Sequence, residues 1–217
     1  MRTRTILKRL LLLPLIVVAY HTLARVVRRF YKFPIPQFLA NAIDNPLRRR
    51  VQPPTATAVR HGLRPGMTVL DIGPGNGRYT VAAAQWVGAA GRVVAIDIEP
   101  KMTQRVRQRA SADGVTNVAP LVASAHDLPF GEATFDAATM ITVMGEIPDP
   151  VRALGEVGRV LVPGGTLACS ELFVDPDYPL ARTLQRWAAE AGLRVNRRIG
   201  GFFYYTLIFE RGGSDGN

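Results

Sequence analysis

The chain has 217 residues, of which 47% are hydrophobic and 20% charged, with 20 Gly and 16 Pro. This composition excludes a collagen, a coiled coil and a mostly disordered chain, and the length predicts one globular domain plus an extension. The single cysteine, Cys169, can form neither an internal disulfide nor a cysteine cluster for zinc, which suits a reducing compartment.

The formal net charge of +10 at pH 7 is unevenly distributed. Residues 1–60 hold 12 Lys and Arg and one acid, Asp44, whereas residues 61–217 hold 15 Lys and Arg and 16 Asp and Glu. A nucleic-acid binder carries its cations on the folded domain that grips the phosphates. Here the surplus lies beside the most apolar stretch of the chain, which argues against nucleic acid as a partner.

Residues 1–33 combine basic ends with an apolar middle. The apolar run from Leu10 to Ala24 has 15 residues, fewer than the roughly 20 that a perpendicular spanning helix needs. It could be an interfacial helix, a spanning anchor extended to Val27, or a signal peptide, although no small-x-small cleavage site follows Tyr20. A helix packed on the protein's own core would not need seven or more cations around it. We expect an N-terminal apolar helix that associates with a membrane, whether spanning or interfacial.

Residues 34–64 are expected to form a proline-rich connector. Five prolines between positions 34 and 54 interrupt any long helix. Between them, residues Gln37 to Ile43 allow a short helix. The run Arg48-Arg49-Arg50 is either a solvated face or a contact with anionic headgroups.

Short apolar runs alternate with helical patterns from residue 65 to residue 211. The expected strands are Thr68–Ile72, Arg92–Asp97, Val118–Val122, Phe135–Val143, Thr166–Ser170, Leu193–Ile199 and Phe202–Glu210. The expected helices are Tyr79–Val87, Lys101–Ala112, Val151–Leu161 and Leu180–Ala191. This alternation predicts a mainly parallel sheet with helices on both faces, and the closing strand pair predicts an antiparallel edge. Residues 212–217 are expected to be a flexible tail.

Ligands of such sheets bind beyond the carboxyl ends of the strands. There the first strand leads into Asp71-Ile-Gly73-Pro-Gly75-Asn-Gly77, whose glycines let the backbone turn and approach a ligand. The dinucleotide fingerprint G-x-G-x-x-G fails because Arg78 stands at its last glycine, so a ligand without a diphosphate is favoured. Asp97 ends the second strand, where a carboxylate can accept two hydrogen bonds from a ribose diol or cap the next helix.

Five segments carry a family resemblance: VLDIGPGNGRYT (69–80), VVAIDIEPKM (93–102), ASAHDLPF (123–130), FDAATMITVMGEIPDP (135–150) and LGEVGRVLVPGGTLACSE (154–171). In this order they resemble the motifs of class I S-adenosylmethionine-dependent methyltransferases, especially the branch that includes ubiquinone and menaquinone C-methyltransferases. The resemblance covers about residues 65–171 and leaves out residues 1–55. It implies a Rossmann-like, seven-stranded, mainly parallel sheet with an antiparallel last strand, and S-adenosyl-L-methionine as the cofactor.

The resemblance also implies a cofactor-binding set. Its members are Asp71, Gly73 and Gly75 around the methionine moiety, Asp97 at the ribose, Ile98, Ser124 and Ala125 at the adenine, and Ile141 near the sulfonium. Ser124 stands where the family usually has Asp, and it cannot act as a charged acceptor. The backbone or side chain of Ala125 and His126 is then expected to carry the adenine contact.

Methyl transfer from a sulfonium needs few polar residues, because the donor is strongly activated and positioning supplies much of the acceleration. A base is required only if the acceptor must lose a proton, and Glu146 and His126 are the candidates, with Tyr204 more remote. Each of the first two also has a structural interpretation. Glu146 can satisfy free N–H groups before the next helix, which Asp149-Pro150 is expected to begin, and His126 can be a loop residue.

We therefore expect a membrane-associated methyltransferase with a cytoplasmic catalytic domain and a small hydrophobic or lipid-like acceptor. The alternatives are a soluble small-molecule methyltransferase and a non-catalytic protein that binds an adenosyl ligand. A nucleic-acid methyltransferase is disfavoured because Ala138–Ile141 lacks an Asn/Asp-Pro-Pro-Tyr/Phe motif. Phe202, Phe203, Tyr204, Tyr205 and Phe209 alternate like a core-packed strand, and Cys169 is expected to be a small core residue.

Overall fold

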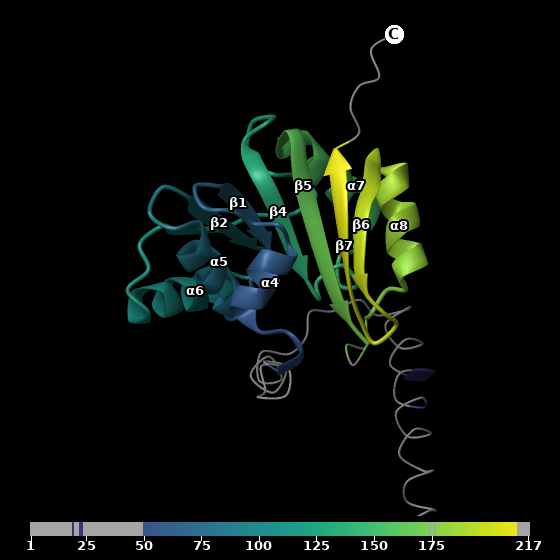
Figure 1. Cartoon of the computed structure of the whole chain (residues 1–217), viewed down its shortest axis with the longest axis horizontal. Helices are drawn as coiled ribbons and strands as arrows, with labels where there is room; N and C mark the ends of the chain where they lie inside the picture. The colour runs from purple at the N-terminus through teal and green to yellow at the C-terminus, as the bar shows by residue number, and fades with distance from the viewer. Residues whose placement is uncertain (1–18, 20–21, 24–49, 174, 176, 212–217) are drawn as a thin grey trace, which may run out of the picture.

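The computed structural model describes residues 19, 22–23, 50–173, 175 and 177–211. Seven strands form one sheet (Figure 1): β1 (Thr68–Ile72), β2 (Arg92–Asp97), β3 (Val118–Val122), β4 (Phe135–Ile141), β5 (Leu161–Leu172), β6 (Leu193–Gly200) and β7 (Tyr204–Arg211). The helices are α4 (Pro54–Arg60), α5 (Arg78–Val87), α6 (Pro100–Ala112), α7 (Pro150–Val160) and α8 (Ala181–Glu190).

The strands lie in the order β3-β2-β1-β4-β5-β7-β6. All neighbours from β3 to β5 are parallel, and β7 is antiparallel to both β5 and β6. The last strand of the chain is thus antiparallel, as predicted, but it lies inside the sheet, and β6 forms the edge. The strand order reverses between β1 and β4, and open α/β sheets bind ligands at such a switch point.

Alternate side chains of β1 point to opposite faces of the sheet. Val69 packs in a cluster with Ala58 of α4 and Ala84 of α5. Leu70 lies in the larger core cluster, together with Leu154 of α7. Both faces of the parallel strands are therefore covered, which explains why these strands read as continuous apolar runs.

The prolines of β3 and α4 stand where the backbone tolerates them. Pro120 lies in β3, an edge strand paired with β2 alone, so its missing N–H leaves no partner unsatisfied. α4 begins at Pro54, where a helix needs no N–H. This helix lies within the stretch expected to be a connector, yet its Ala58 is buried.

The closing aromatic residues divide into two groups. Tyr205 and Phe209 of β7 are buried, as a core-packed strand requires. The prediction is wrong for Phe202 and Phe203, which are 53% and 70% exposed, because β7 begins only at Tyr204 and both residues lie in the turn before it. Cys169 is buried in the core, and burial raises the pKa of its thiol.

Three expected features lie wholly or mostly outside the described residues: the short helix from Gln37 to Ile43, the basic run Arg48-Arg49-Arg50, of which only Arg50 is described, and the tail at 212–217. Of the expected N-terminal apolar helix within 1–33, only residues 19 and 22–23 are described. Among the described residues, no helix combines the length and apolar character that crossing a membrane requires.

Candidate functional site

The loop after β1 turns sharply at three glycines. Gly73, Gly75 and Gly77 have φ angles of +68°, +54° and +77°, a region that L-residues with a Cβ rarely adopt. A Cβ on Gly73 would lie 2.4 Å from Val143 Cγ2, and one on Gly77 would lie 2.9 Å from Val106 Cα. A Cβ on Gly75 would have no neighbour within 4 Å. Two glycines thus let the loop pack closely, and the third borders open space that a ligand can enter.

Asp71 lies beneath this turn and is buried. Its two carboxylate oxygens accept hydrogen bonds from Thr80 Oγ1 of α5 at 2.6 Å and from Thr139 Oγ1 of β4 at 3.0 Å. Burial raises the pKa of Asp71 to about 6, although both hydrogen bonds oppose the rise. Asp71 therefore ties the ends of β1, α5 and β4 together below the open position.

Asp97 and Ile98 lie next to the glycine turn, because β2 neighbours β1. The Gly73 N–H donates to the Ile96 carbonyl at 3.0 Å, one residue before Asp97. The Asp97 carboxylate is partly exposed and accepts the Glu99 N–H at Oδ1 at 2.9 Å. Partial burial raises its pKa, and the backbone hydrogen bonds oppose the rise. Ile98 is 61% exposed, so a carboxylate and an open apolar side chain follow each other at this edge.

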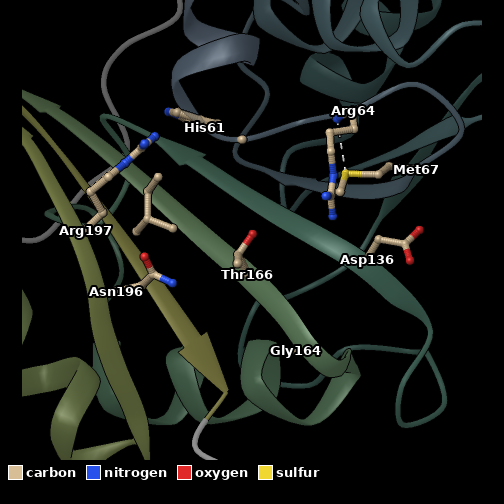
Figure 2. Close-up of a pocket in the computed structure, with 10 residues that line it drawn as sticks. His61, Arg64, Met67, Asp136, Gly164, Thr166, Asn196 and Arg197 are labelled. Atoms are coloured by element: carbon tan, nitrogen blue, oxygen red, sulfur yellow. Dashed lines mark hydrogen bonds between the residues drawn. The ribbon is translucent and has the colours of Figure 1, made fainter.

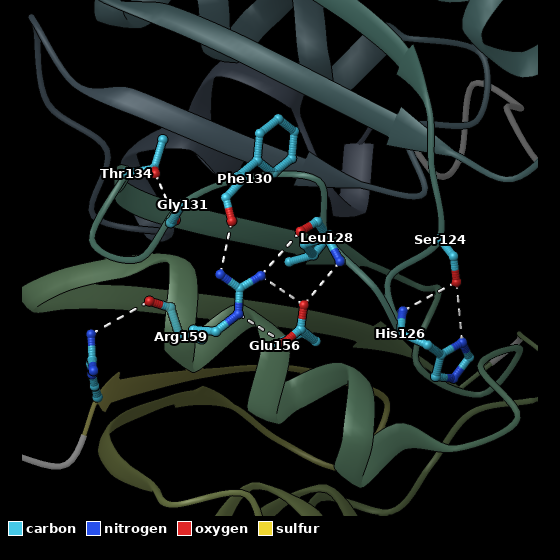
Figure 3. A network of polar contacts seen from close by, with 9 residues as sticks. Ser124, His126, Leu128, Phe130, Gly131, Thr134, Glu156 and Arg159 are labelled. Carbon is cyan, nitrogen blue, oxygen red and sulfur yellow. Dashed lines mark hydrogen bonds and ion pairs between the residues drawn. The ribbon is translucent and has the colours of Figure 1, made fainter.

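The connection between β3 and β4 holds Ser124 and His126 (Figure 3), with Ala125 between them in the sequence. Ser124 Oγ accepts the His126 N–H at 3.2 Å and lies 3.4 Å from His126 Nδ1. His126 Nε2 accepts the Asp149 N–H at 3.4 Å. A neutral ring that accepts at Nε2 carries its proton on Nδ1, from which it donates to Ser124. Both ring nitrogens are thus engaged, while Ala125 packs partly buried against the main core.

The same connection is held from α7 by an ion pair that the sequence analysis missed (Figure 3). Arg159 donates to the carbonyls of Phe130 at 2.8 Å and Leu128 at 3.0 Å, and Glu156 Oε2 accepts the Leu128 N–H at 2.9 Å. Arg159 also lies 2.8 Å from Glu156 Oε2, and this contact lowers the pKa of Glu156 to about 2. The i,i+3 spacing of the pair on a predicted helix was the available signal.

The end of β4 brings Ile141 and Glu146 to this edge of the sheet. Ile141 pairs with Ser170 of β5 and is half-buried. The next residue, Thr142, has a φ of +52° and donates its N–H to the Ser170 carbonyl at 2.8 Å. A β-branched residue in this conformation is strained, and such strain concentrates at functional sites. Glu146 follows in a turn closed by its N–H to the Val143 carbonyl at 3.0 Å, and it is half-buried.

The N-terminus of α7 confirms one further prediction. Asp149 precedes the helix, and its side chain accepts the Arg152 N–H at 3.2 Å. Pro150 is the first residue of the helix. The Asp149-Pro150 pair therefore acts as an N-cap followed by a proline at the first helical position.

A buried polar chain joins α4 to the sheet, and no sequence motif marked it. His61 Nε2 lies 2.7 Å from Ser170 Oγ, which lies 2.7 Å from Thr206 Oγ1 of β7. His61 is buried, and burial together with the nearby Arg60 lowers the pKa of its imidazole to about 3. The ring is therefore neutral at physiological pH and links α4 to β5 and β7 through hydrogen bonds.

A separate cavity of about 200 Å³ opens on the α4 side of the sheet (Figure 2). It is lined by His61, Gly62, Arg64, Met67, Asp136, Gly164, Thr166, Asn196, Arg197 and Ile208. None of the residues predicted to bind the cofactor lines it. Asp136 and Thr166 lie near the amino ends of the parallel strands, away from the glycine turn.

The structure thus brings most of the predicted residues to one edge of the sheet. The pairing of β1 with β2 and the hydrogen bond from the Gly73 N–H to the Ile96 carbonyl bring Asp71, the glycine turn and Asp97 together. The loop with Ser124 begins next to Asp97, whose carbonyl accepts the Ala123 N–H at 3.1 Å. Asp71 differs from the other predicted residues because both of its carboxylate oxygens already accept hydrogen bonds within the protein. Its observed role is therefore to support the glycine turn. Its contact with the methionine moiety stays a prediction.

Known proteins resemble this chain in both sequence and structure. Residues 69–165 match the family described as "Methyltransferase domain". The ubiquinone/menaquinone biosynthesis C-methyltransferase UbiE of Enterobacter sp. strain 638 is 34% identical over 139 residues, 64% of this chain and 55% of that protein. The demethylmenaquinone methyltransferase of Staphylococcus aureus strain MRSA252 is 36% identical over 110 residues, 51% of this chain and 45% of that protein. The chain thus spans about half the length of the curated relatives it matches.

A solved structure shares the fold. The crystal structure of a SAM-dependent methyltransferase from Aquifex aeolicus superposes with a TM-score of 0.76 at 24% identity, covering 82% of this chain and all of that one. At this identity the likeness establishes the fold alone.

The residues at the glycine turn fit S-adenosylmethionine, the cofactor of the methyltransferases that this chain resembles. The space beside Gly75 is open, and the Asp97 carboxylate is partly exposed at the end of the neighbouring strand β2. Ile98 offers an open apolar surface for an aromatic base. Residues 69–165 therefore match a methyltransferase domain, and the chain is similar in sequence to ubiquinone and menaquinone C-methyltransferases over about half of their length.

Proposed function

We propose that this protein transfers the methyl group of S-adenosylmethionine to a ring carbon of a small, hydrophobic, quinone-like acceptor at a membrane, with its catalytic domain in the cytoplasm. One observation carries the proposal. The open position at Gly75 and the partly exposed Asp97 share the carboxyl edge of the sheet with the strained end of β4. The names of the relatives support a quinone-like acceptor.

The residues at this edge have distinct tasks in the proposed reaction. When bound, the cofactor supplies a methyl group on a positively charged sulfur, which needs no further activation. Asp97 holds the ribose, Ile98 covers one face of the adenine, and the glycine turn leaves space for the methionine end. Ile141 and Thr142 orient the acceptor, so that most of the acceleration comes from positioning.

A carbon acceptor must lose a proton, and Glu146 is the better placed base. In ring methylation the carbon–carbon bond forms as the carbon–sulfur bond breaks, and the ring hydrogen then leaves as a proton. Glu146 is a half-buried carboxylate in the turn directly after β4. His126 has hydrogen-bond partners at both ring nitrogens, which leaves neither nitrogen open to the acceptor without rearrangement.

The membrane part of the proposal rests on sequence. Residues 1–33 carry an apolar run of 15 residues between clusters of Arg and Lys. Such a segment suits attachment to a bilayer with anionic headgroups, where quinone-like molecules with long tails reside. The spanning and interfacial forms of this attachment both remain part of the proposal.

The test is a methyl-transfer assay with the purified full chain, labelled S-adenosylmethionine and a short-tailed naphthohydroquinone kept reduced in detergent. The expected result is label on a ring carbon by mass spectrometry, with at least a tenfold loss in Asp97→Asn. The control Asp113→Asn removes an exposed carboxylate from the end of α6 and should keep full activity.

Calorimetric titration with the cofactor separates the alternatives. Binding without product across hydroquinone acceptors and membrane extracts would support the non-catalytic adenosyl-ligand protein. Product from polar acceptors, with the full chain absent from membrane fractions, would support a soluble small-molecule methyltransferase.

A further inference from the structure

The turn between β6 and β7 exposes two large aromatic side chains. Phe202 and Phe203 are 53% and 70% exposed. Because β6 runs parallel to β5, this turn lies at the same edge of the sheet as the carboxyl ends of β4 and β5 (Figure 1). The aromatic turn and the candidate cofactor site therefore face the same side of the molecule.

Phe173 and Tyr178 hold both phenylalanines in this exposed position. Phe173 lies 4.9 Å from the Phe202 ring and 5.6 Å from the Phe203 ring, measured between centroids. The Phe173 N–H donates to the Phe203 carbonyl at 2.8 Å, and the Tyr178 hydroxyl donates to the Phe202 carbonyl. Hydrogen bonds to their carbonyls therefore hold the two exposed phenylalanines in place. A contiguous exposed apolar surface of this kind marks an interaction site.

The strand that leads to this turn is strongly basic. Residues 180–200 contain five arginines and a single acid, Glu190, although residues 61–217 as a whole carry slightly more acids than bases. Arg197 and Arg198 are exposed and lie within three residues of the turn. Glu190 lies 3.7 Å from Arg186 of α8, and Glu210 pairs in register with Arg194 at the far end of β6. These two acids lie away from the turn, but the half-buried Asp175 and Asp177 lie in the segment whose Tyr178 donates to the Phe202 carbonyl. Three cations lie near the turn: Arg197, Arg198 and Arg60, whose guanidinium is 4.7 Å from the centroid of the Tyr204 ring.

We propose that this aromatic turn, residues 200–203, and the basic end of β6 form a contact with an anionic lipid bilayer, separate from the N-terminal segment. Phe202 and Phe203 enter the interface between headgroups and acyl chains, and Arg197 and Arg198 bind the phosphates, the combination by which proteins lie on anionic membranes. Charge complementarity selects this occupant, because Arg60, Arg197 and Arg198 outnumber the two half-buried carboxylates near the turn, and an acceptor molecule or a second copy would not require this surplus of cations beside the apolar pair. The contact directs the carboxyl edge of the sheet, with the cofactor site, toward the bilayer.

A tryptophan placed at the turn reports this contact in the full chain. In Phe203→Trp, fluorescence is recorded with vesicles of phosphatidylcholine and phosphatidylglycerol at 7:3, and with the same vesicles carrying brominated acyl chains. We expect a blue shift and at least a twofold brominated-lipid quenching, after the signal of Trp86 and Trp187 in the unchanged protein is subtracted. High salt and the double variant Arg197→Gln/Arg198→Gln in this background should reduce the quenching.

The matched control is Ala90→Trp, an exposed position in the turn before β2, at the opposite edge of the sheet. This probe should show no quenching, even when the N-terminal segment holds the protein on the vesicle. Equal quenching at the two positions, or none at Phe203→Trp, would overturn the proposal. The proposal would also be overturned if Phe203→Trp showed no quenching by brominated lipid and Phe203→Ser changed the oligomeric state. That result would show that the turn makes a contact between copies of the chain. The readout requires no methyl transfer, so it can fail while the proposed function stands.

Discussion

Arg159 and Glu156 of α7 lie 2.8 Å apart, and together they hold the connection between β3 and β4 at three main-chain groups. This connection contains no helix, although it must cross two strands to reach β4. The ion pair supplies what a packed helix would otherwise supply. It fixes the loop that carries Ser124 and His126, where we expect the adenine to bind.

Replacing Arg159 with Met should loosen this loop. The carbonyls of Leu128 and Phe130 lose their donor, and Glu156 loses its cation, so we expect a loss of about 2 kcal/mol in the free energy of unfolding. Hydrogen exchange in residues 123–134 should rise, and the affinity for the cofactor should fall several-fold. Chemical denaturation, exchange mass spectrometry and calorimetric titration measure these changes.

Arg186→Met is the control for this variant. It breaks an exposed i,i+4 pair with Glu190 at 3.7 Å, and such pairs contribute at most about 0.5 kcal/mol. If both variants lost equal stability, and exchange at 123–134 stayed unchanged, the ion pair would be a surface contact without a role in the loop.

The close packing of the glycine turn leads to a second prediction. Gly73→Ala should destabilise the protein by about 2 to 4 kcal/mol, because its φ is positive and its Cβ would overlap Val143 Cγ2 at 2.4 Å. Gly114→Ala has nearly the same φ, +65°, with no atom within 4 Å, and should cost only about 1 kcal/mol. Urea denaturation of both variants measures the difference. Adding Val143→Ala should recover part of the loss at Gly73, and the absence of any recovery would contradict the contact.

Local patterns predicted the parallel part of the sheet well, for a physical reason. Strands buried on both faces need continuous apolar runs, and tight turns at their carboxyl ends need glycine, so Thr68–Ile72 and Gly73–Gly77 carry signals within a few residues. The resemblance to the family then linked these motifs to a cofactor. The end of a strand can depend on the backbone angle of a single residue. The predicted strand Phe135–Val143 ends at Ile141 in the structure, because Thr142 has a positive φ.

Hydrogen-bond partners that are far apart in the chain could not be predicted from the sequence. The partners of Asp71 are nine and 68 residues away, and Ser170 meets His61 across 109 residues. Nothing in the periodicity of either segment marks such a meeting. The exposed Phe202 and Phe203 show the same limit: alternation predicts a strand, but the position of the turn decides whether its side chains are buried.

Asp71 should make the protein less stable as the pH rises. Its pKa is about 6 when folded and 3.8 ordinarily, so the folded state holds the proton more tightly between these values. The free energy of unfolding should therefore fall by about 3 kcal/mol from pH 3.8 to above pH 6 through this group. In Asp71→Asn this contribution disappears, while the amide can still pair with the threonine hydroxyls.

The measurement for Asp71 is urea denaturation from pH 4 to pH 7, expressed as the difference between variant and unchanged protein. Asp71→Asn should gain relative stability as the pH rises, and Asp113→Asn, which removes an exposed carboxylate, controls for the change in net charge. A difference for Asp71→Asn that stays flat across this range would contradict a buried, proton-retaining carboxylate.

His61 acts in the opposite direction, because its pKa falls from 6.5 to about 3 on folding. The unfolded chain binds a proton below pH 6.5 and the folded protein does not, so this group's stabilisation is complete above pH 6.5 and is lost on acidification. At pH 4.5 the loss should reach about 3 kcal/mol. His61→Gln keeps a hydrogen-bonding group for Ser170 but cannot titrate. Its stability relative to the unchanged protein should therefore rise between pH 7 and pH 4.5 in urea denaturation, and parallel curves would show that the imidazole is protonated inside the fold.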